Sequence, residues 1–364
     1  MRRPSWRGFL GSIYRWPAGI RGSRVGITGP TWIAASCALL LVLLLTGRPN
    51  AASPDTLYWF APLPPMPERP GRPYVGSDDF MELFSPDAAW QEASRHIQVF
   101  KLYGEWVYAV ATDQQLEQVV TDLRRRGIAL AVEIGPLSTE GCGDGVEGFA
   151  QPQWAHIADR IQAVGGTIDY IEMDEPYYYA HVFDGAHACR WSAATVAKKL
   201  GEFIGDARKR FPNVVIGVVE PLTGRAHAAE YQAWTEVFRA VNGFKLTFLH
   251  MDIDWRRRDW PREAKILERY ARRRGISVGI IYDGNYGDRT DATWLINAGE
   301  RAKRYERDAA GHPDHVLFQS WHDKPDHLLP ETAAFTFTQF IDRYFAGRPH
   351  IGLAAVTSLA GQRE

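Results

Sequence analysis

Eight times along this chain, a short apolar run is followed by a longer segment with helical periodicity. The runs, rich in β-branched and aromatic residues, lie at 57–62, 97–103, 128–134, 168–174, 214–220, 246–253, 277–283 and 315–321. Strands that alternate with helices pair in parallel, and eight such units fit a closed barrel better than an open sheet. No glycine-rich turn of the dinucleotide-binding type follows the first run. The sequence therefore predicts an α/β fold, a single (β/α)8 TIM barrel over residues 57–346.

The segments between these runs carry the sequence signals of helix ends. We expect helices near 86–95, 113–126, 153–164, 191–210, 226–241, 260–274, 291–309 and 331–346. Gly127 and Gly275 each follow a basic turn, which is common at helix C-termini. Ser192 and Asp291 are predicted as N-caps because their side chains can accept a backbone N–H.

The N-terminal region predicts a targeting or membrane segment. Residues 1–31 contain six arginines and no acidic residue, and they precede an apolar stretch at 32–46. This order is typical of a signal peptide or of a signal anchor, and both place the rest of the chain outside the cytoplasm. Whether segment 1–46 is cleaved or stays in the membrane is left open. A linker is expected at 47–56 and a C-terminal tail at 347–364.

Composition narrows the classes of partner and cofactor. The net charge is −1, so no basic surface field is predicted and nucleic acid is not an expected partner. Cys37 lies inside the apolar segment, and the other two cysteines have no zinc-ligand spacing, so no metal or cofactor is expected. Cys142 and Cys189 fall in the loops after strands 3 and 4, which are neighbours in a barrel. We therefore predict a disulfide between them.

The strongest chemical motif ends the fourth strand, at Ile-Glu-Met-Asp-Glu-Pro, residues 171–176. Alternation along a strand turns Glu172 and Asp174 to the barrel interior, and Glu175 stands where Pro176 breaks the strand. Active sites of such barrels lie at the C-terminal ends of the strands. Three acids in four residues there indicate catalysis, although solvated acids at a helix start are an alternative.

This motif resembles the clan A glycoside hydrolases, (β/α)8 enzymes whose fourth strand ends in Asn-Glu-Pro. The resemblance implies that Glu175 is the general acid/base. It also implies that Asp174 takes the place of the asparagine that binds a sugar hydroxyl. The additional negative charge would raise the proton affinity of Glu175, which suits a general acid.

The same resemblance is partial at strands 7 and 8. Clan A enzymes carry a nucleophilic glutamate at the end of strand 7, where this chain has Asp283. Asp283 is therefore predicted as the nucleophile or, in an inverting mechanism, as the base toward water. At strand 8, Trp321 matches a tryptophan that floors the sugar subsite, although core packing is the alternative.

The predicted function is cleavage of an oligo- or polysaccharide outside the cytoplasm, by a glycosidase with no cofactor. Residues expected to bind the carbohydrate are Asp174, Glu172, Glu220, Trp321, Gln319, His322, Tyr103 and Asp252. One alternative is an inactive barrel that binds polysaccharide during export or assembly. Another, a metal-dependent hydrolase, would need His250, Asp252 and a further ligand to converge.

Overall fold

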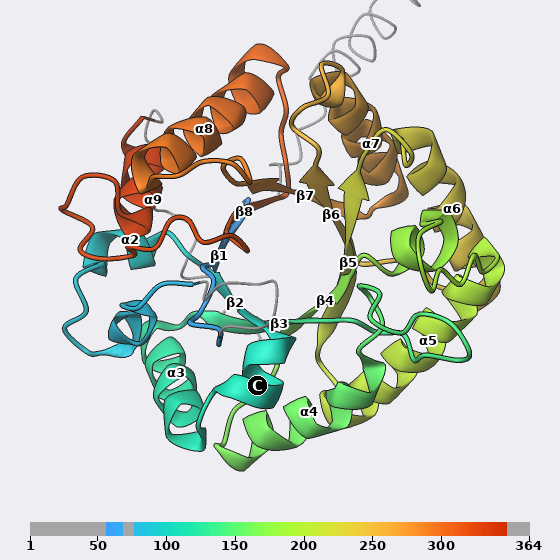
Figure 1. The fold of residues 1–364 in the computed structure, drawn as a ribbon, viewed down its shortest axis with the longest axis horizontal. Helices are drawn as coiled ribbons and strands as arrows, with labels where there is room; N and C mark the ends of the chain where they lie inside the picture. The colour runs from blue at the N-terminus through green and yellow to red at the C-terminus, as the bar shows by residue number, and fades with distance from the viewer. Residues whose placement is uncertain (1–55, 68–75, 348–364) are drawn as a thin grey trace, which may run out of the picture. The chain divides into compact units, whose positions relative to one another are not determined.

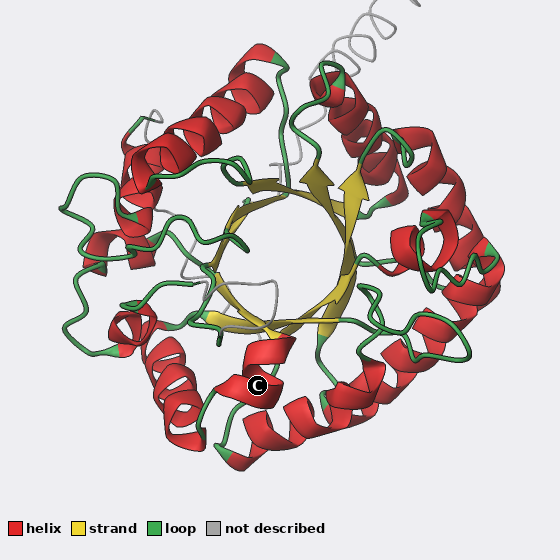
Figure 2. Ribbon diagram, viewed as in Figure 1, coloured by secondary structure: helices red, strands yellow, loops and turns green. Residues whose placement is uncertain are grey.

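Each strand pairs in parallel with the next one along the chain, and the eighth pairs with the first, which closes a barrel. This computed structural model describes residues 56–67 and 76–347. Figures 1 and 2 show the strands as an inner ring and the longer helices around it. The predicted TIM barrel is therefore confirmed for the described residues.

All eight predicted strands are present. They are β1 Leu57–Ala61, β2 Val99–Tyr103, β3 Ala129–Ile134, β4 Tyr170–Asp174, β5 Val215–Leu222, β6 Phe248–Ile253, β7 Ser277–Tyr282 and β8 His315–Gln319. The register aligns Glu133 with Glu172 and Asp174 with Val219. The pairing of β3 with β4 thus brings the carboxylates of Glu133 and Glu172 to the same height in the barrel.

The helices occupy the segments between the strands. The α-helices are α2 Gln91–Arg95, α3 Asp113–Arg126, α4 Trp154–Ala163, α5 Ala193–Arg210, α6 Ala228–Asn242, α7 Trp260–Arg274, α8 Asp291–Lys303 and α9 Phe337–Ala346. Shorter helical turns are η1 Phe80–Phe84, η2 Trp106–Val110, η3 Gln151–Gln153, η4 Tyr178–Val182 and η5 Arg304–Asp308.

The predicted helix ends are right in three of four places. Gly127 and Gly275 end α3 and α7 in the left-handed conformation, with φ of 71° and 66°, and Ser192 caps α5 by accepting the N–H of Thr195. The prediction that Asp291 is an N-cap is wrong. Thr290 caps α8 instead, since it has the extended backbone of a cap.

The apolar core has two layers. A large outer layer lies between strands and helices and includes Ile171 and Met173 of β4. A small inner layer fills one part of the barrel interior with Trp59, Val99, Ala131, Val219, Phe248, Ile281 and Leu317. Two residues further along five of these strands stand polar side chains, namely Lys101, Glu133, His250, Asp283 and Gln319.

Among the described helices, none combines the length and the apolar character needed to cross a bilayer. The predicted signal or anchor at 1–46 lies outside the described residues. So do nearly all of the predicted linker and the tail from residue 348.

Candidate active site

Glu175 occupies a strained turn directly after β4. Its φ is +42°, a left-handed conformation that non-glycine residues seldom adopt. Its N–H donates to the carbonyl of Val219 on β5 at 3.1 Å, which fixes the turn against the neighbouring strand. The side chain is only 7% exposed. Strain of this kind concentrates at functional sites, where the surrounding structure maintains it.

The surroundings of Glu175 favour its protonated form. Burial raises the pKa of Glu175 well above its ordinary value, and the charges of Asp252, Glu147 and Asp174 raise it further. Asp252 at the end of β6 is hydrogen-bonded to Glu175, and its own pKa is also raised, chiefly by burial. A carboxyl that keeps its proton at neutral pH can act as a general acid.

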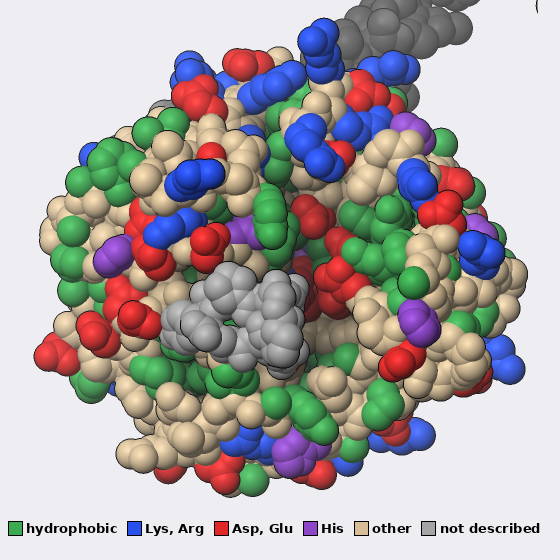
Figure 3. Space-filling model, viewed as in Figure 1, with side chains coloured by type: hydrophobic (Ala, Val, Ile, Leu, Met, Phe, Trp, Pro, Cys, Tyr) green, Lys and Arg blue, Asp and Glu red, His purple; other side chains and the backbone are tan. Residues whose placement is uncertain are grey.

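Asp174, the last residue of β4, is partly exposed beside Glu175. Burial raises its pKa well above the ordinary value, with further contributions from the charges of Glu133 and Glu147. Figure 3 shows acidic side chains gathered in the hollow at the centre of the barrel. The site is therefore rich in carboxyl groups whose pKa values are raised by burial and by one another.

Asp283 follows β7 and is 3% exposed. Its Oδ1 accepts hydrogen bonds from the indole N–H of Trp255 and from Arg301, the latter at 3.3 Å. Burial raises the pKa of Asp283 to about 7, while Arg301 and Trp255 oppose this shift. The pKa of Asp283 thus lies nearer neutrality, and its carboxylate is oriented by two donors.

Glu172 lies deeper in the barrel and is fully buried. It accepts hydrogen bonds from the ammonium group of Lys101 and from Nδ1 of His250. Lys101 also donates to Glu133 at 2.5 Å and to Gln319 at 2.7 Å. Glu172 and Gln319 were expected to bind substrate. The structure gives both of them partners within the barrel, beneath the acids at the strand ends.

The two buried histidines continue this network. Because Nδ1 of His250 donates to Glu172, Nε2 is its acceptor, and it lies 2.8 Å from Nδ1 of His315. Burial lowers the pKa of both rings, so both are neutral. Both ring nitrogens of His250 are engaged, and the convergence that a metal-dependent hydrolase requires is not formed there.

In the described part of the chain, three metal-ligand atoms come within 4.8 Å of one another only at Asp291, Asp326 and His327. This cluster contains its own cation, because Lys324 lies 3.6 Å from Asp291 and bonds to Asp326.

Glu220 on β5 is almost completely buried and accepts two backbone hydrogen bonds. The N–H groups of Tyr177 and Tyr178 donate to its two carboxylate oxygens at 2.9 and 3.0 Å. Burial raises its pKa to about 8 despite these donors. Glu220 was expected to bind a sugar hydroxyl, but its contacts connect it to the turn that carries Glu175.

Aromatic side chains lie beyond the acids, on the segment after β8. Trp321 is partly exposed, and its ring lies 5.1 Å from that of His322. His322 in turn meets Tyr286, which is 86% exposed. Tyr103 is buried and donates to the carbonyl of Ser320 at 2.8 Å. Trp321, which also packs against the core, forms a partly exposed aromatic surface with His322 and Tyr286, whereas Tyr103 fixes the segment after β8.

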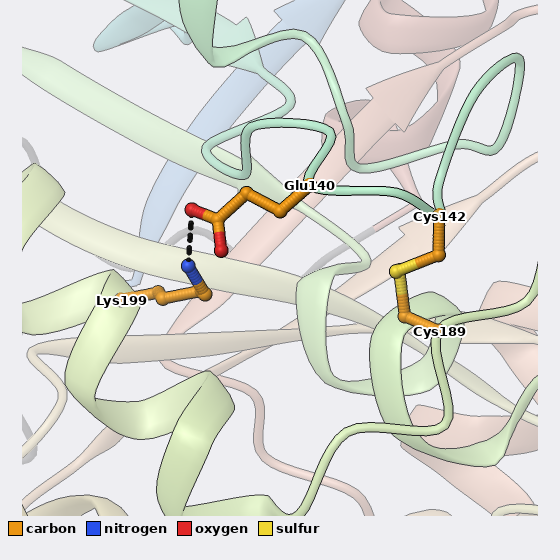
Figure 4. The surroundings of a disulfide bond; sticks show 4 residues. All are labelled: Glu140, Cys142, Cys189 and Lys199. Carbon is orange, nitrogen blue, oxygen red and sulfur yellow. Dashed lines mark hydrogen bonds and ion pairs between the residues drawn. A yellow bond between two sulfur atoms is a disulfide. The ribbon is translucent and has the colours of Figure 1, made fainter.

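The predicted disulfide is confirmed. Cys142 and Cys189 are bonded, with Cα atoms 5.1 Å apart, and they join the loops after β3 and β4 (Figure 4). The sequence reasoning named Tyr179 only as part of the aromatic run 177–179 that could line a sugar-binding cleft, and it did not single out Glu147. The hydroxyl of Tyr179 bonds to Glu147, whose charge acts on Asp174 and Glu175. No periodicity marks Glu147 in its loop, although it lies five residues after a predicted disulfide cysteine.

Known proteins resemble this chain at low sequence identity. No family model matches this chain, and no curated protein matches it. A solved fungal β-1,4-galactanase is 9% identical, with a TM-score of 0.47, over 79% of this chain and all of that chain. A GH5_18 protein from Streptomyces cattleya, solved with GlcNAc, is 9% identical, with a TM-score of 0.47, over 82% of each chain. An HpcH/HpaI aldolase from Desulfitobacterium hafniense is 12% identical, with a TM-score of 0.35, over 74% of this chain and 87% of that chain. Because all three TM-scores lie below 0.5, these likenesses carry no argument about this chain.

Proposed function

We propose that this protein is a glycoside hydrolase that cleaves an oligo- or polysaccharide outside the cytoplasm. The observation that carries the proposal is Glu175 itself. It is a carboxyl on a strained turn at the C-terminal end of a barrel strand, and burial, with the charges of acidic neighbours, raises its pKa well above the ordinary value. Barrel enzymes place their catalytic residues at these strand ends.

Glu175 has the role of proton donor to the leaving glycosidic oxygen. Departure of the leaving group develops negative charge on that oxygen, and a nearby carboxylic acid lowers the barrier by transferring its proton. The raised pKa of Glu175 keeps the acid form available at neutral pH. After transfer Glu175 is a carboxylate, and in a retaining mechanism it can accept a proton from the incoming water.

Asp283 has the second role, as nucleophile or as base toward water. It must be ionised for either role, and Arg301 and Trp255 stabilise and orient its carboxylate. Retaining enzymes have carboxyl groups about 5–5.5 Å apart, and inverting ones about 6.5–9.5 Å. The configuration of the first-formed product distinguishes the two mechanisms.

Substrate binding is assigned to the exposed part of the site. Trp321 and His322 present rings on which the apolar face of a sugar can stack, and Asp174 and Asp252 can accept hydrogen bonds from its hydroxyl groups. The disulfide supports an oxidising compartment, in agreement with the N-terminal prediction.

One observation favours a second candidate, a barrel that binds polysaccharide without cleaving it. The only acid at the end of β7 is Asp283, and it is paired with Arg301. A screen of the purified protein against polysaccharides, with detection of new reducing ends, separates the candidates. Release of reducing ends supports the hydrolase, and saturable binding without release supports the binding protein.

A further inference from the structure

The turn that follows Asp283 presents a tyrosine ring to solvent. Tyr286 is 86% exposed, more than any other large hydrophobic side chain in the described part of the chain. A single exposed ring is common on protein surfaces, so the surroundings of Tyr286 decide whether it is a candidate for binding.

Hydrogen bonds close the turn that carries Tyr286 and tie it to a helix. The N–H of Asn285 donates to the carboxylate of Asp288 at 2.7 Å, and the N–H of Asp288 donates to the carbonyl of Asn285 at 3.0 Å. The side-chain amide of Asn297, on α8, donates to both carboxylate oxygens of Asp288, at 3.0 and 2.8 Å. Tyr286 thus stands at the tip of an ordered turn, so its backbone loses little freedom when a ligand binds.

The same turn is joined to Asp283 through one guanidinium group. Arg301 of α8 donates to the carbonyl of Gly284 at 2.7 Å and bonds to the side-chain oxygen of Asn285. It also donates to Oδ1 of Asp283 at 3.3 Å. Three residues of chain span at most about 11 Å, so the Cα atom of Tyr286 lies within that distance of the Cα atom of Asp283. One carbohydrate chain can therefore meet both residues.

Tyr286 is the outermost of three aromatic rings in contact. Its ring meets that of His322 edge to face, with centroids 5.2 Å apart and an angle of 81° between the planes. The ring of His322 lies 5.1 Å from that of Trp321. Trp321 follows β8 and packs against the inner apolar layer, so it stands over the barrel interior. The three rings therefore extend from the C-terminal end of the barrel out to the turn after β7.

We propose that Tyr286 forms a stacking subsite for a sugar unit of the substrate, beyond the unit that Trp321 contacts. A flat aromatic ring can cover the apolar C–H face of a pyranose while the hydroxyl groups at the sugar's edge stay in water. A substrate that uses this subsite extends past the unit held at Asp283, so the inference assigns a chain of several sugar units as the ligand. It rests on the proposed function for the class of ligand.

The experiment measures how Y286A, Y286F and Y108A bind and cleave oligomers of increasing length. Y108A is the matched control, because Tyr108 is also exposed and its ring also meets a histidine, His156, edge to face, at 5.4 Å. The probes are linear β-1,4-linked gluco-, manno- and N-acetylgluco-oligosaccharides, from disaccharide to hexasaccharide. Calorimetry gives the dissociation constants in the E175Q background, where cleavage is slowed, and steady-state kinetics gives KM and kcat with Glu175 intact.

The effect of Y286A should depend on the length of the probe. For the sugar series that binds most tightly, Y286A is expected to raise Kd about three- to tenfold for the hexasaccharide and to leave it unchanged for the disaccharide. KM should follow Kd, with kcat unchanged. Y286F should bind like the parent protein, because phenylalanine keeps the ring, and Y108A should have no effect. An unchanged melting temperature verifies that Y286A keeps the fold.

Three results separate the subsite from the proposed function. Equal affinity of Y286A and its parent for every probe contradicts the subsite and leaves the proposed function intact. A loss in Y286F as large as that in Y286A also contradicts it, because the hydroxyl and not the ring would then make the contact. If the wild type neither binds nor cleaves any probe, the proposed function fails and this inference fails with it.

Discussion

The buried carboxylate of Glu220 accepts the backbone N–H of Tyr177 at 2.9 Å, two residues after Glu175. A second bond, from the N–H of Tyr178, engages its other oxygen. Because the turn at Glu175 is strained, its conformation depends on bonds such as these. Glu220 is therefore expected to position the candidate acid rather than to touch the sugar.

Substitution of Glu220 by glutamine tests this expectation. A glutamine side chain has one acceptor oxygen in place of two, so one of the two backbone donors loses its partner. We expect kcat to fall about 10–100-fold with a small change in KM, since misplacement of a catalytic group lowers the rate of the chemical step. E202Q, on the exposed side of α5, is the control. A KM effect with unchanged kcat would assign Glu220 to substrate binding instead.

Stability should fall as the pH rises from 6.5 to 9. Glu220 has a folded pKa of about 8 against an ordinary value of 4.5, so the folded state binds the proton more tightly. That stabilisation is complete below pH 4.5 and is lost as the pH rises through 8, at about 1.4 kcal/mol for each pH unit. Glu133, with a pKa of about 7, acts in the same direction.

The lower limit of 6.5 avoids the buried histidines, whose lowered pKa has the opposite effect in more acidic solution. Thermal unfolding at constant ionic strength measures the difference. The melting temperature is expected to be higher at pH 6.5, and E220Q should reduce the difference between the two pH values. A higher melting temperature at pH 9 would contradict these pKa directions.

The pH dependence of kcat/KM should report the two carboxyl groups. Asp283 must lose its proton to act, so activity should rise as the pH increases through about 7. Activity should fall again at higher pH, where Glu175 loses the proton that it must donate. D283N should abolish turnover on a natural polysaccharide while retaining binding. An acid limb near pH 4 would exclude Asp283 as the ionising group.

The location of the chain is tested by a reporter fused after Glu364. The basic segment 1–31 and the apolar segment 32–46 predict that the fusion is periplasmic or external. A cytoplasmic reporter signal would overturn that interpretation of the N-terminal region.

Much of the fold could be predicted because the signals are local. Short apolar runs between helical segments located every strand, and the glycines after α3 and α7 marked helix ends. The segment from 331 was less predictable. The carboxylate of Glu331 caps α2 instead of starting a helix, since it accepts the N–H groups of Glu92 and Ala93. Helix α9 begins six residues later, and no local pattern reveals a partner 238 residues away.

Residues of the candidate site could be predicted only where their position along a strand determined where the side chain lies. Asp174, Glu175 and Asp283 were found because they end strands. Alternation also turned Glu172 inward, but it did not indicate that Lys101 and His250 would engage both of its oxygens. The contacts of Glu147 depend on how the loops after β3 and β4 pack against each other. The disulfide prediction brought these two loops together, but it did not specify which side chains meet.

The central claim is that Glu175 is the general acid, and E175Q tests it most directly. Glutamine keeps the shape of the side chain and removes the proton that it donates. On a polysaccharide that the wild type cleaves, the rate should fall by about 10²–10⁴, with binding retained and the melting temperature little changed. Hydrolysis of that polysaccharide by E175Q at the full wild-type rate would contradict the assignment.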